Sequence, residues 1–399
     1  MEHSLDQKIA GILPRLIELR KDLHRIPERG FAEYQTAEKV AGYMEDLGLT
    51  VETGIGGTGV MGLLEGRQPG PILGIRACLD GLEMAEHSGV SYASEIPGMF
   101  HGCGHDGNMT MALGAANVLF RMKDQLKGTV KFIFQPSEEE TGGAQAMMEA
   151  GVLKDPDVHA MFHIHNWHGL KEHTIGVKAG PVLASSDVFR LTISGKPGHG
   201  AWPHLAVDPL VVAADLVSAI QRILSREIAP MKPALITIGK IQGGTAVNII
   251  PETVTLEGTV RAYHEDVRTF IARRLDEAAD GITRAARASY ELTLHRIMPP
   301  AVNDATLAGR VSRILDASLS SQVTEDMTGE MGCEEFALFQ EQIPGLFLFL
   351  GNDIEGEPVV PLHDPRYIFN DSILPTGVKA YCEIVLNYGS ADMEEEPHL

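Results

Sequence analysis

The sequence predicts an α/β protein whose main sheet is mostly parallel, with a smaller α+β domain inserted into it. The chain has 399 residues, which is more than one ordinary core holds, so two domains are expected. Strand and helix patterns alternate in the first and last parts of the chain, whereas the middle part has the pattern of an antiparallel sheet with two helices. We therefore place one domain at residues 1–183 and 303–399, and the other at residues 184–302.

The elements of the larger domain are predicted from two kinds of apolar pattern. Apolar residues at helical spacing indicate amphipathic helices, and short apolar runs indicate buried strands. Strands that alternate with helices are typical of crossover connections in a parallel sheet. The predicted helices are residues 9–25, 36–47 and 109–122, and the predicted strands are residues 72–77, 130–134, 160–164 and 345–350.

The elements of the smaller domain follow the same patterns in a different order. Two helices separated by pairs of strands favour a compact antiparallel sheet with both helices on one face. The predicted strands are residues 187–194, 234–242, 253–263 and 290–296, and the predicted helices are residues 208–224 and 267–288. After this domain the chain returns to helix–strand–helix order, and only the acidic segment 392–396 is expected to be loosely ordered.

Composition excludes several classes of function. A formal net charge of −21 argues against a nucleic-acid partner, which requires a basic face. The N-terminal segment lacks the basic start and apolar run of a signal peptide, and no segment is apolar over the length of a bilayer, so no membrane partner is expected. The four cysteines have no disulfide-like spacing, which favours a cytoplasmic location.

The segment from His101 to Asp106 is the most informative stretch for chemistry. It places Cys103 and His105 two residues apart between glycines, with a carboxylate adjoining. This is a chelating arrangement for a borderline-soft divalent metal. The alternative is a small buried thiol in a turn, which is common for a single cysteine.

Further polar clusters follow the predicted strands, where ligands gather in open parallel sheets. Each has an ordinary alternative: an acidic triplet such as Glu138 to Glu140 is usually a solvated helix start, and a lone His363 is usually a surface histidine. Five clusters at successive strand ends favour a metal-dependent hydrolase instead. The clusters are Arg76 to Asp80, Cys103 with His105, Gln135 to Glu140, Phe162 to Trp167, and Leu362 to Asp364.

At this point the chain resembles the amidohydrolase branch of the aminoacylase and carboxypeptidase metallopeptidases, which includes hippurate hydrolases, N-acyl-amino-acid amidohydrolases and plant auxin-conjugate hydrolases. The resemblance implies a phosphorylase/hydrolase-like catalytic domain with an inserted ferredoxin-like dimerisation domain. It covers nearly the whole chain, with its motifs in the family's order. The motifs run from Leu23-His24-Arg25-Ile26-Pro27-Glu28 to Leu362-His363-Asp364-Pro365 and Phe369-Asn370-Asp371.

The resemblance also assigns roles at the metal site. It implies two divalent ions per subunit, which could be Zn, Mn, Co or Ni. Glu138 would be the general base, and Asp80 would orient a ligand imidazole. His165 is preferred to His163 as a ligand because it begins a His-Asn-Trp motif. The implied metal ligands are Cys103, His105, Glu139, His165 and His363.

In the smaller domain, three residues within further motifs of the family receive roles by the same resemblance. His199 and Asn248 would reach the active site of a neighbouring subunit, where His199 would stabilise the oxyanion, and Arg261 would hold the substrate carboxylate. This implies a homodimer or a higher homo-oligomer. An alternative is that the glycines around these residues are turn residues and that His199 caps a strand end.

The predicted activity is hydrolysis of the amide bond of N-acyl amino acids or similar small amides. Two alternatives stay open: a dipeptidase or other C–N hydrolase on the same scaffold, and a catalytically silent metal-binding dimer. The sequence departs from the family pattern without removing any implied ligand, and two departures, Cys78 for Asp and Asn108 for His, flank the metal cluster. The others are Glu83 for Pro, Glu140 for Gly and His168 for Pro.

Overall fold

The computed structural model describes residues 4–319 and 322–389 and divides the chain into two compact units. The first unit consists of Met1–Gly180, Val302–Thr328 and Leu338–Leu399, and the second of Pro181–Ala301 and Gly329–Ala337. Residues 329–337 thus join the second unit, whereas the sequence pattern placed them in the larger domain. The acidic segment 392–396 lies outside the described residues.

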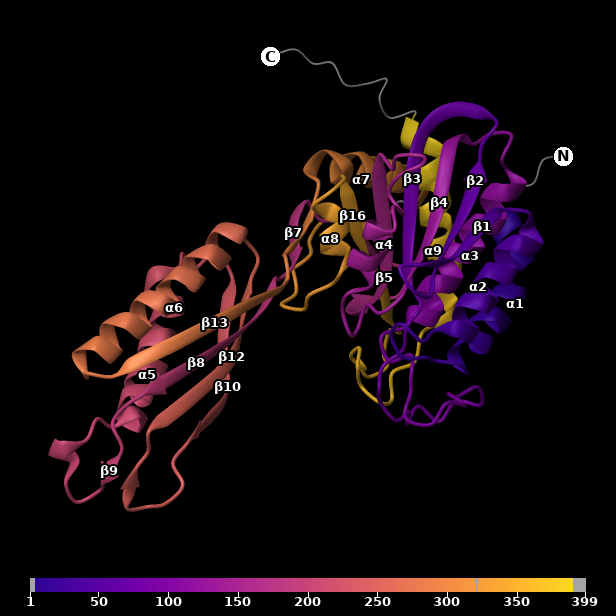
Figure 1. The fold of residues 1–399 in the computed structure, drawn as a ribbon. Coiled ribbons are helices and arrows are strands. Elements are labelled where there is room, and N and C mark those ends of the chain that lie inside the picture. The colour runs from indigo at the N-terminus through magenta and orange to yellow at the C-terminus, as the bar shows by residue number, and fades with distance from the viewer. Residues whose placement is uncertain (1–3, 320–321, 390–399) are drawn as a thin grey trace, which may run out of the picture. The chain divides into compact units, whose positions relative to one another are not determined.

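The first unit is built on an eight-stranded sheet with the order β1-β2-β4-β3-β5-β16-β6-β15 (Figure 1). Its centre, β4-β3-β5-β16, is parallel throughout, and antiparallel pairs occur toward the edges. The predicted mixed α/β fold with a large, mostly parallel sheet is confirmed. The strands are β1 (Thr50–Ile55), β2 (Gly59–Glu65), β3 (Gln68–Cys78), β4 (Lys127–Gln135), β5 (Ala160–Lys171), β6 (Ile175–Gly176), β15 (Val323–Thr324) and β16 (Gly345–Asp353).

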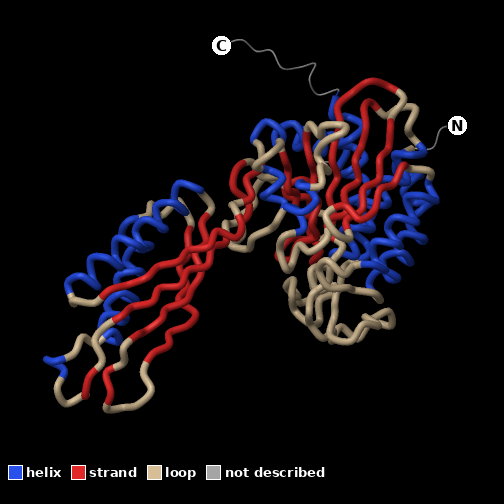
Figure 2. Tube along the Cα trace, viewed as in Figure 1, coloured by secondary structure: helices blue, strands red, loops and turns tan. Residues whose placement is uncertain are grey.

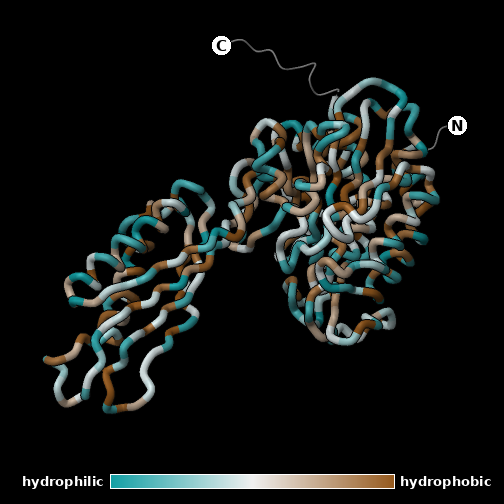
Figure 3. The backbone as a smooth tube through the Cα atoms, viewed as in Figure 1, coloured by the Kyte–Doolittle hydropathy of each residue, from teal (hydrophilic) through white to brown (hydrophobic). Residues whose placement is uncertain are grey.

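Three helices of the first unit pack around α3, which is buried from His105 to Leu119. Helices α1, α2 and α9 contact α3, and Figure 3 shows hydrophobic stretches of the chain among the central elements. None of the helices in the described part of the chain combines the length and the hydropathy needed to span a bilayer. The helices are α1 (Leu5–His24), α2 (Tyr34–Leu47), α3 (His105–Arg121), α4 (Gly143–Glu149), α7 (Ala305–Leu319), α8 (Phe336–Gln340), α9 (Leu374–Asn387) and the 3₁₀ turn η3 (Asp371–Ile373).

Two of the element boundaries that differ from the sequence prediction lie at the candidate site. Helix α3 begins at His105 rather than at Met109, because Gly104 supplies a left-handed N-cap and the helix starts inside the glycine-rich segment. Strand β5 continues to Lys171, so His165 lies within the strand and not after it. The carboxyl ends of β3 and β4 and the second half of β5 nevertheless share one edge of the sheet, where Figure 2 shows the loops gathered.

The second unit is a four-stranded antiparallel sheet with the order β10-β12-β8-β13 and the chain order βαββαβ. Helices α5 and α6 contact each other and the same sheet, and they close an apolar core that includes Phe189, Leu216 and Ile271. The main elements are β8 (Ser186–Ser194), α5 (Pro209–Glu227), β10 (Ala234–Gly243), β12 (Thr253–Ala262), α6 (Glu265–Ala285) and β13 (Ser289–Met298). The short elements of this unit, or at its ends in the chain, are β7 (Gly180–Leu183), β9 (Gly198–His199), η1 (Pro203–Leu205), β11 (Ile249–Ile250) and β14 (Ala301–Asn303).

Candidate metal centre

The turn that carries Cys103 and His105 depends on the glycine between them. Gly104 has φ 77° and is the N-cap of α3, so the chain reverses and enters the helix at His105. A Cβ atom at this position would lie 2.5 Å from Oδ1 of Asn166, which is closer than side-chain atoms approach. Only glycine therefore provides both the backbone conformation and the space.

The structure brings all five predicted metal ligands together in the first unit. Cys103, His105 and His165 form one group, and Cys103, Glu139 and His363 form another, with the ligand atoms of each group within 4.8 Å of one another. Sγ of Cys103 is 3.6 Å from Nε2 of His165, and Nε2 of His363 is 3.3 Å from Oε1 of Glu139. Two overlapping groups that share Cys103 match the donor set of a two-metal site.

The orientation of the histidines supports metal binding by the same set. Nδ1 of His105 is 2.9 Å from the carbonyl oxygen of Asp80, and Nδ1 of His165 is 2.7 Å from the carbonyl oxygen of Asn166. These bonds fix the tautomer that leaves Nε2 as the donor atom, as in most metal-binding histidines. Nε2 of His105 is buried and has no hydrogen-bond partner among the described residues. The thiolate, imidazole and carboxylate donors fit a borderline divalent metal.

His363 reaches this cluster from a strained loop position. Its φ is 65°, a conformation that non-glycine residues rarely adopt, and its N–H donates to the carbonyl oxygen of Gly102 over 2.9 Å. The side chain is half-exposed, whereas Glu139 is largely covered. The loop after β16 is thereby attached to the loop of Cys103.

Glu138 and Asp80 lie beside the ligands. One carboxylate oxygen of Glu138 is within 4.8 Å of the ligand atoms of His105 and Glu139. Oδ2 of Asp80 accepts a hydrogen bond from the N–H of Glu139 over 2.8 Å, and Oδ1 is 3.5 Å from Nδ1 of His105. Asp80 therefore contacts two of the predicted ligands at once.

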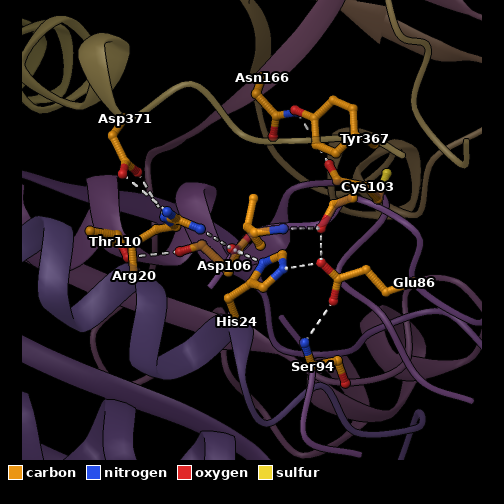
Figure 4. A network of polar contacts seen from close by, with 12 residues as sticks. Arg20, His24, Glu86, Ser94, Cys103, Asp106, Thr110, Asn166, Tyr367 and Asp371 are labelled. Carbon is orange, nitrogen blue, oxygen red and sulfur yellow. Dashed lines mark hydrogen bonds and ion pairs between the residues drawn. The ribbon is translucent and has the colours of Figure 1, made fainter. Parts of the chain in front are cut away.

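Asp106 does not join the ligand groups of the described residues, although the sequence pattern placed it in the chelating turn. It is fully buried, and its Oδ2 accepts a hydrogen bond from Nδ1 of His24 over 2.8 Å (Figure 4). Arg20 contacts the same oxygen at 3.4 Å and is paired through two nitrogens with Asp371. Both cations therefore contact Oδ2, whereas Oδ1 of Asp106 is buried without a hydrogen-bond partner among the described residues.

His24 is held in its charged form by carboxylates on both sides. Nδ1 faces Asp106, and Nε2 faces Glu86 at 3.2 Å, so both nitrogens must donate. Burial lowers the pKa of His24, but the charges and hydrogen bonds of Asp106 and Glu86 outweigh it and raise the pKa to about 9. Burial likewise raises the pKa of Asp106, yet the charge of His24 holds it well below the usual range.

The predicted substrate residues His199 and Asn248 are adjacent in the second unit. Strand β9, which ends at His199, pairs with β11, and the N–H of Gly200 donates to the carbonyl oxygen of Asn248 over 2.8 Å. Nδ1 of His199 accepts from the N–H of Ala201 over 3.1 Å, so the neutral ring carries its proton on Nε2. The exposed His199 thus presents a hydrogen-bond donor.

Arg261 lies in β12 of the same unit and is half-buried. Nη1 donates to the carbonyl oxygen of Met331 over 2.8 Å, which fixes the guanidinium group. Its other N–H groups make no hydrogen bond within the described residues. A fixed guanidinium with donors remaining is suited to a carboxylate ligand.

Residues that support the cluster had no individual signal in the sequence. Asn166 donates from Nδ2 to the carbonyl oxygen of Cys103 and to the hydroxyl oxygen of Tyr367. Its own N–H donates to Oδ1 of Asn108 over 3.1 Å. Asn166 therefore links the Cys103 loop, strand β5 and the C-terminal piece. The His-Asn-Trp motif contained this residue but did not indicate these contacts.

The departures from the family pattern have identifiable places. Cys78 is fully buried at the end of β3, and Asn108 is buried on α3, where it holds the backbone after His165. Glu83 and Glu140 share one partner, because Nε of Arg29 lies 3.4 Å from Glu83 and 2.6 Å from Glu140. Two of the changes therefore form one exposed ion-pair group next to the Glu138–Glu139 pair.

The chain is similar to known proteins over most of its length. Residues 74–387 match the model of peptidase family M20/M25/M40. The chain is 36% identical over 373 residues to the N-acetylcysteine deacetylase of Bacillus subtilis, covering 93% of this chain and 96% of that protein. It is 34% identical to IAA-amino acid hydrolase ILR1-like 4 of Arabidopsis thaliana, covering 94% and 85%. The crystal structure of the Bacillus subtilis protein YXEP, described as a dinuclear metal-binding peptidase, superposes with a TM-score of 0.85 at 33% identity and covers 96% of this chain and 99% of that one.

Proposed function

Because this chain belongs to peptidase family M20/M25/M40 and is a metal-dependent amidohydrolase, we propose that it cleaves the amide bond of N-acyl amino acids. The observation that carries the proposal is the convergence of Cys103, His105, Glu139, His165 and His363 next to Glu138. The relatives named for N-acetylcysteine and for an IAA–amino acid conjugate support the acyl-amino-acid class.

Two divalent ions would be held by this cluster. His105 and His165 would bind through Nε2 and Cys103 through Sγ, with Glu139 and His363 completing the set. The relative described as dinuclear supports two ions, and the mixed donor set suits Zn, Mn, Co or Ni. When bound, such ions polarise the amide carbonyl and lower the pKa of water toward neutrality.

Glu138 would carry the proton through the reaction. Its carboxylate takes a proton from the attacking water as the oxygen bonds to the amide carbon. The same carboxyl group then gives that proton to the nitrogen as the C–N bond breaks, and the products are a carboxylic acid and an amino acid. Asp80 would hold His105 and the backbone of Glu139 in place during these steps.

The second unit would bind the substrate and pair two subunits. Nε2 of His199 would donate to the carbonyl oxygen as it becomes negative, and Arg261 would bind the free carboxylate of the amino acid. Asn248 would support His199 from the adjoining strand. Exposed apolar side chains near His199, including Trp202, support burial of this region in a homodimer.

A reducing location is proposed for the same enzyme. All four cysteines lie within the described residues, and none of them is in a disulfide. Cys103 must stay a thiolate to act as a ligand. We therefore propose that the enzyme is located in the cytoplasm.

The proposed function is tested by metal removal and reconstitution. Chelation should abolish hydrolysis of N-acetyl and N-benzoyl amino acids, and one or more of Zn, Mn, Co and Ni should restore it at about two ions per chain. A free-amine dipeptide should be a poorer substrate than its N-acylated counterpart. Faster hydrolysis of the free dipeptide would assign the enzyme to the dipeptidases instead. If the protein binds metal but hydrolyses neither N-acyl amino acids nor dipeptides, the proposal is contradicted and the silent metal-binding dimer is favoured.

A further inference from the structure

The loop that carries Glu138 is a closed turn. Strand β4 ends at Gln135, and Ser137 follows with φ 48°. The hydroxyl of Ser137 donates to the carbonyl oxygen of Thr141 over 3.2 Å, and the N–H of Thr141 donates to the carbonyl oxygen of Glu138 over 3.3 Å. These two hydrogen bonds close the turn that contains Glu138, Glu139 and Glu140. Ser137 lies at the start of this turn in a strained conformation.

The peptide N–H groups on the two sides of Glu138 each donate to a carboxylate. The N–H of Glu139 donates to Oδ2 of Asp80 over 2.8 Å. The N–H of Ser137 donates to Oε1 of Glu33 over 2.8 Å. Asp80 already has a role beside the ligand His105, whereas Glu33 contacts no predicted ligand and belongs to none of the metal-ligand groups of the described residues.

Glu33 is held in place by hydrogen bonds to both of its carboxylate oxygens. It is fully buried and stands at the N-cap of α2, yet its side chain makes no cap hydrogen bond to that helix. Its second oxygen instead accepts a hydrogen bond from the hydroxyl of Thr58 in the turn between β1 and β2. The segment before α2 also lies directly against the loop, because a Cβ at Gly30 would be 2.5 Å from Oγ of Ser137.

We propose that Glu33 is a positioning residue for Glu138, holding the strained Ser137 so that the neighbouring carboxylate stays beside the metal ligands. The proposal rests on the proposed role of Glu138 as general base. Ser137 is buried, so without Glu33 its N–H has no acceptor and the backbone must move to find one. A shift of the reacting group by about 1 Å can cost about 100-fold in rate.

The role of Glu33 does not depend on its charge. Burial raises the pKa of Glu33, and the hydrogen bonds from Thr58, from the backbone N–H of Glu33 itself and from Ser137 oppose that rise. Both the ionised and the neutral carboxyl group keep an oxygen that accepts from Ser137. An amide oxygen in the same place would accept equally well, which makes Glu33→Gln the conservative variant.

The experiment compares Glu33→Ala, Glu33→Gln and Glu28→Ala with the wild-type protein on an N-acetyl amino acid. Glu28 is the matched control, because its carboxylate bonds to the N–H groups of Gln35 and Thr36 at the start of the same helix and not to the Ser137 loop. Glu33→Ala should lower kcat by at least about tenfold with KM and bound metal unchanged. Glu33→Gln should keep kcat within about twofold, and Glu28→Ala should lower only the thermal midpoint.

Hydrogen exchange gives a readout that is independent of turnover. The backbone amides of residues 136–141 should exchange faster in Glu33→Ala than in Glu28→Ala. Equal exchange in the two variants, or a kcat for Glu33→Ala equal to that of Glu28→Ala, would overturn the proposal. Loss of bound metal in Glu33→Ala would also overturn it, since Glu33 would then serve the ligand Glu139. A wild-type protein without amide hydrolysis would refute the proposed function, and the exchange comparison would still decide the role of Glu33.

Discussion

Asn166 donates a hydrogen bond from Nδ2 to the backbone carbonyl oxygen of Cys103 across 3.2 Å. The same amide group lies against Gly104, where a Cβ atom would come within 2.5 Å of Oδ1. Strand β5 carries His165 next to Asn166, so this contact sets the distance between two segments that bear predicted ligands. The metal centre therefore depends on the absence of a side chain at position 104.

Gly104→Ala should weaken metal binding as well as stability. The left-handed φ of 77° costs an alanine about 1–2 kcal/mol, and the new methyl group must also displace Asn166. Displacement of Asn166 moves Cys103 away from His165, so the affinity for Zn should fall. Gly98→Ala is the matched control, because Gly98 has φ 76° but nothing within 4 Å of its Cβ position. Titration of both metal-free variants with Zn checks this, and equal Zn affinities would contradict it.

Glu138→Gln should remove catalysis and leave the metals in place. The amide cannot take a proton from water, and loss of a general base typically costs about 10²–10⁴-fold in rate. Glu138 lies beside the ligands His105 and Glu139, so kcat should fall while the metal content stays at the wild-type value. Glu140→Gln, which alters only the exposed ion pair with Arg29, should stay close to the wild type. Full activity in Glu138→Gln would exclude the proposed mechanism.

The buried His24 predicts a loss of stability in alkali. Its pKa is about 9 in the folded protein and 6.5 in the unfolded chain, so its contribution is complete below pH 6.5 and is lost as the pH rises through 9. The shift corresponds to at most about 3 kcal/mol. The difference in unfolding free energy between the wild type and His24→Gln should therefore shrink between pH 6 and pH 9.5, as measured by urea titration of metal-free protein. His295→Gln, at an exposed position of β13, should show no such change.

The central sheet and the candidate ligands were both indicated by local features of the sequence. Buried strands are visible as apolar runs, and Cys103, His105 and Glu139 stand in short motifs. The supporting contacts were not predictable, because they join residues far apart in the chain. Asn166 and Tyr367 are 201 residues apart, and Glu33 and Ser137 are 104 apart.

The partners of Asp106 were not predictable for the same reason. This carboxylate adjoins the Cys103–His105 pair, and nothing in the local sequence indicated which residues would pair with it. The cations that pair with the Asp106 carboxylate are Arg20 and His24, which belong to α1, more than 80 residues earlier in the chain. A local motif can identify a residue as polar and buried, but its partner is set by the packing of α1 against α3.

A mixture of two inactive variants tests whether His199 serves the neighbouring subunit. Glu138→Gln lacks the base and His199→Ala lacks the oxyanion donor, so each homodimer should be nearly inactive. If His199 acts across the dimer, a mixed dimer has one site with Glu138 from one subunit and His199 from the other. Random pairing of equal amounts makes half of the dimers mixed, each with one complete site, so about a quarter of the wild-type activity should return. The mixture should be refolded together and assayed against each variant alone, with the mass in solution confirming the dimer. If no activity returns although mixed dimers have formed, His199 does not act in the partner's site.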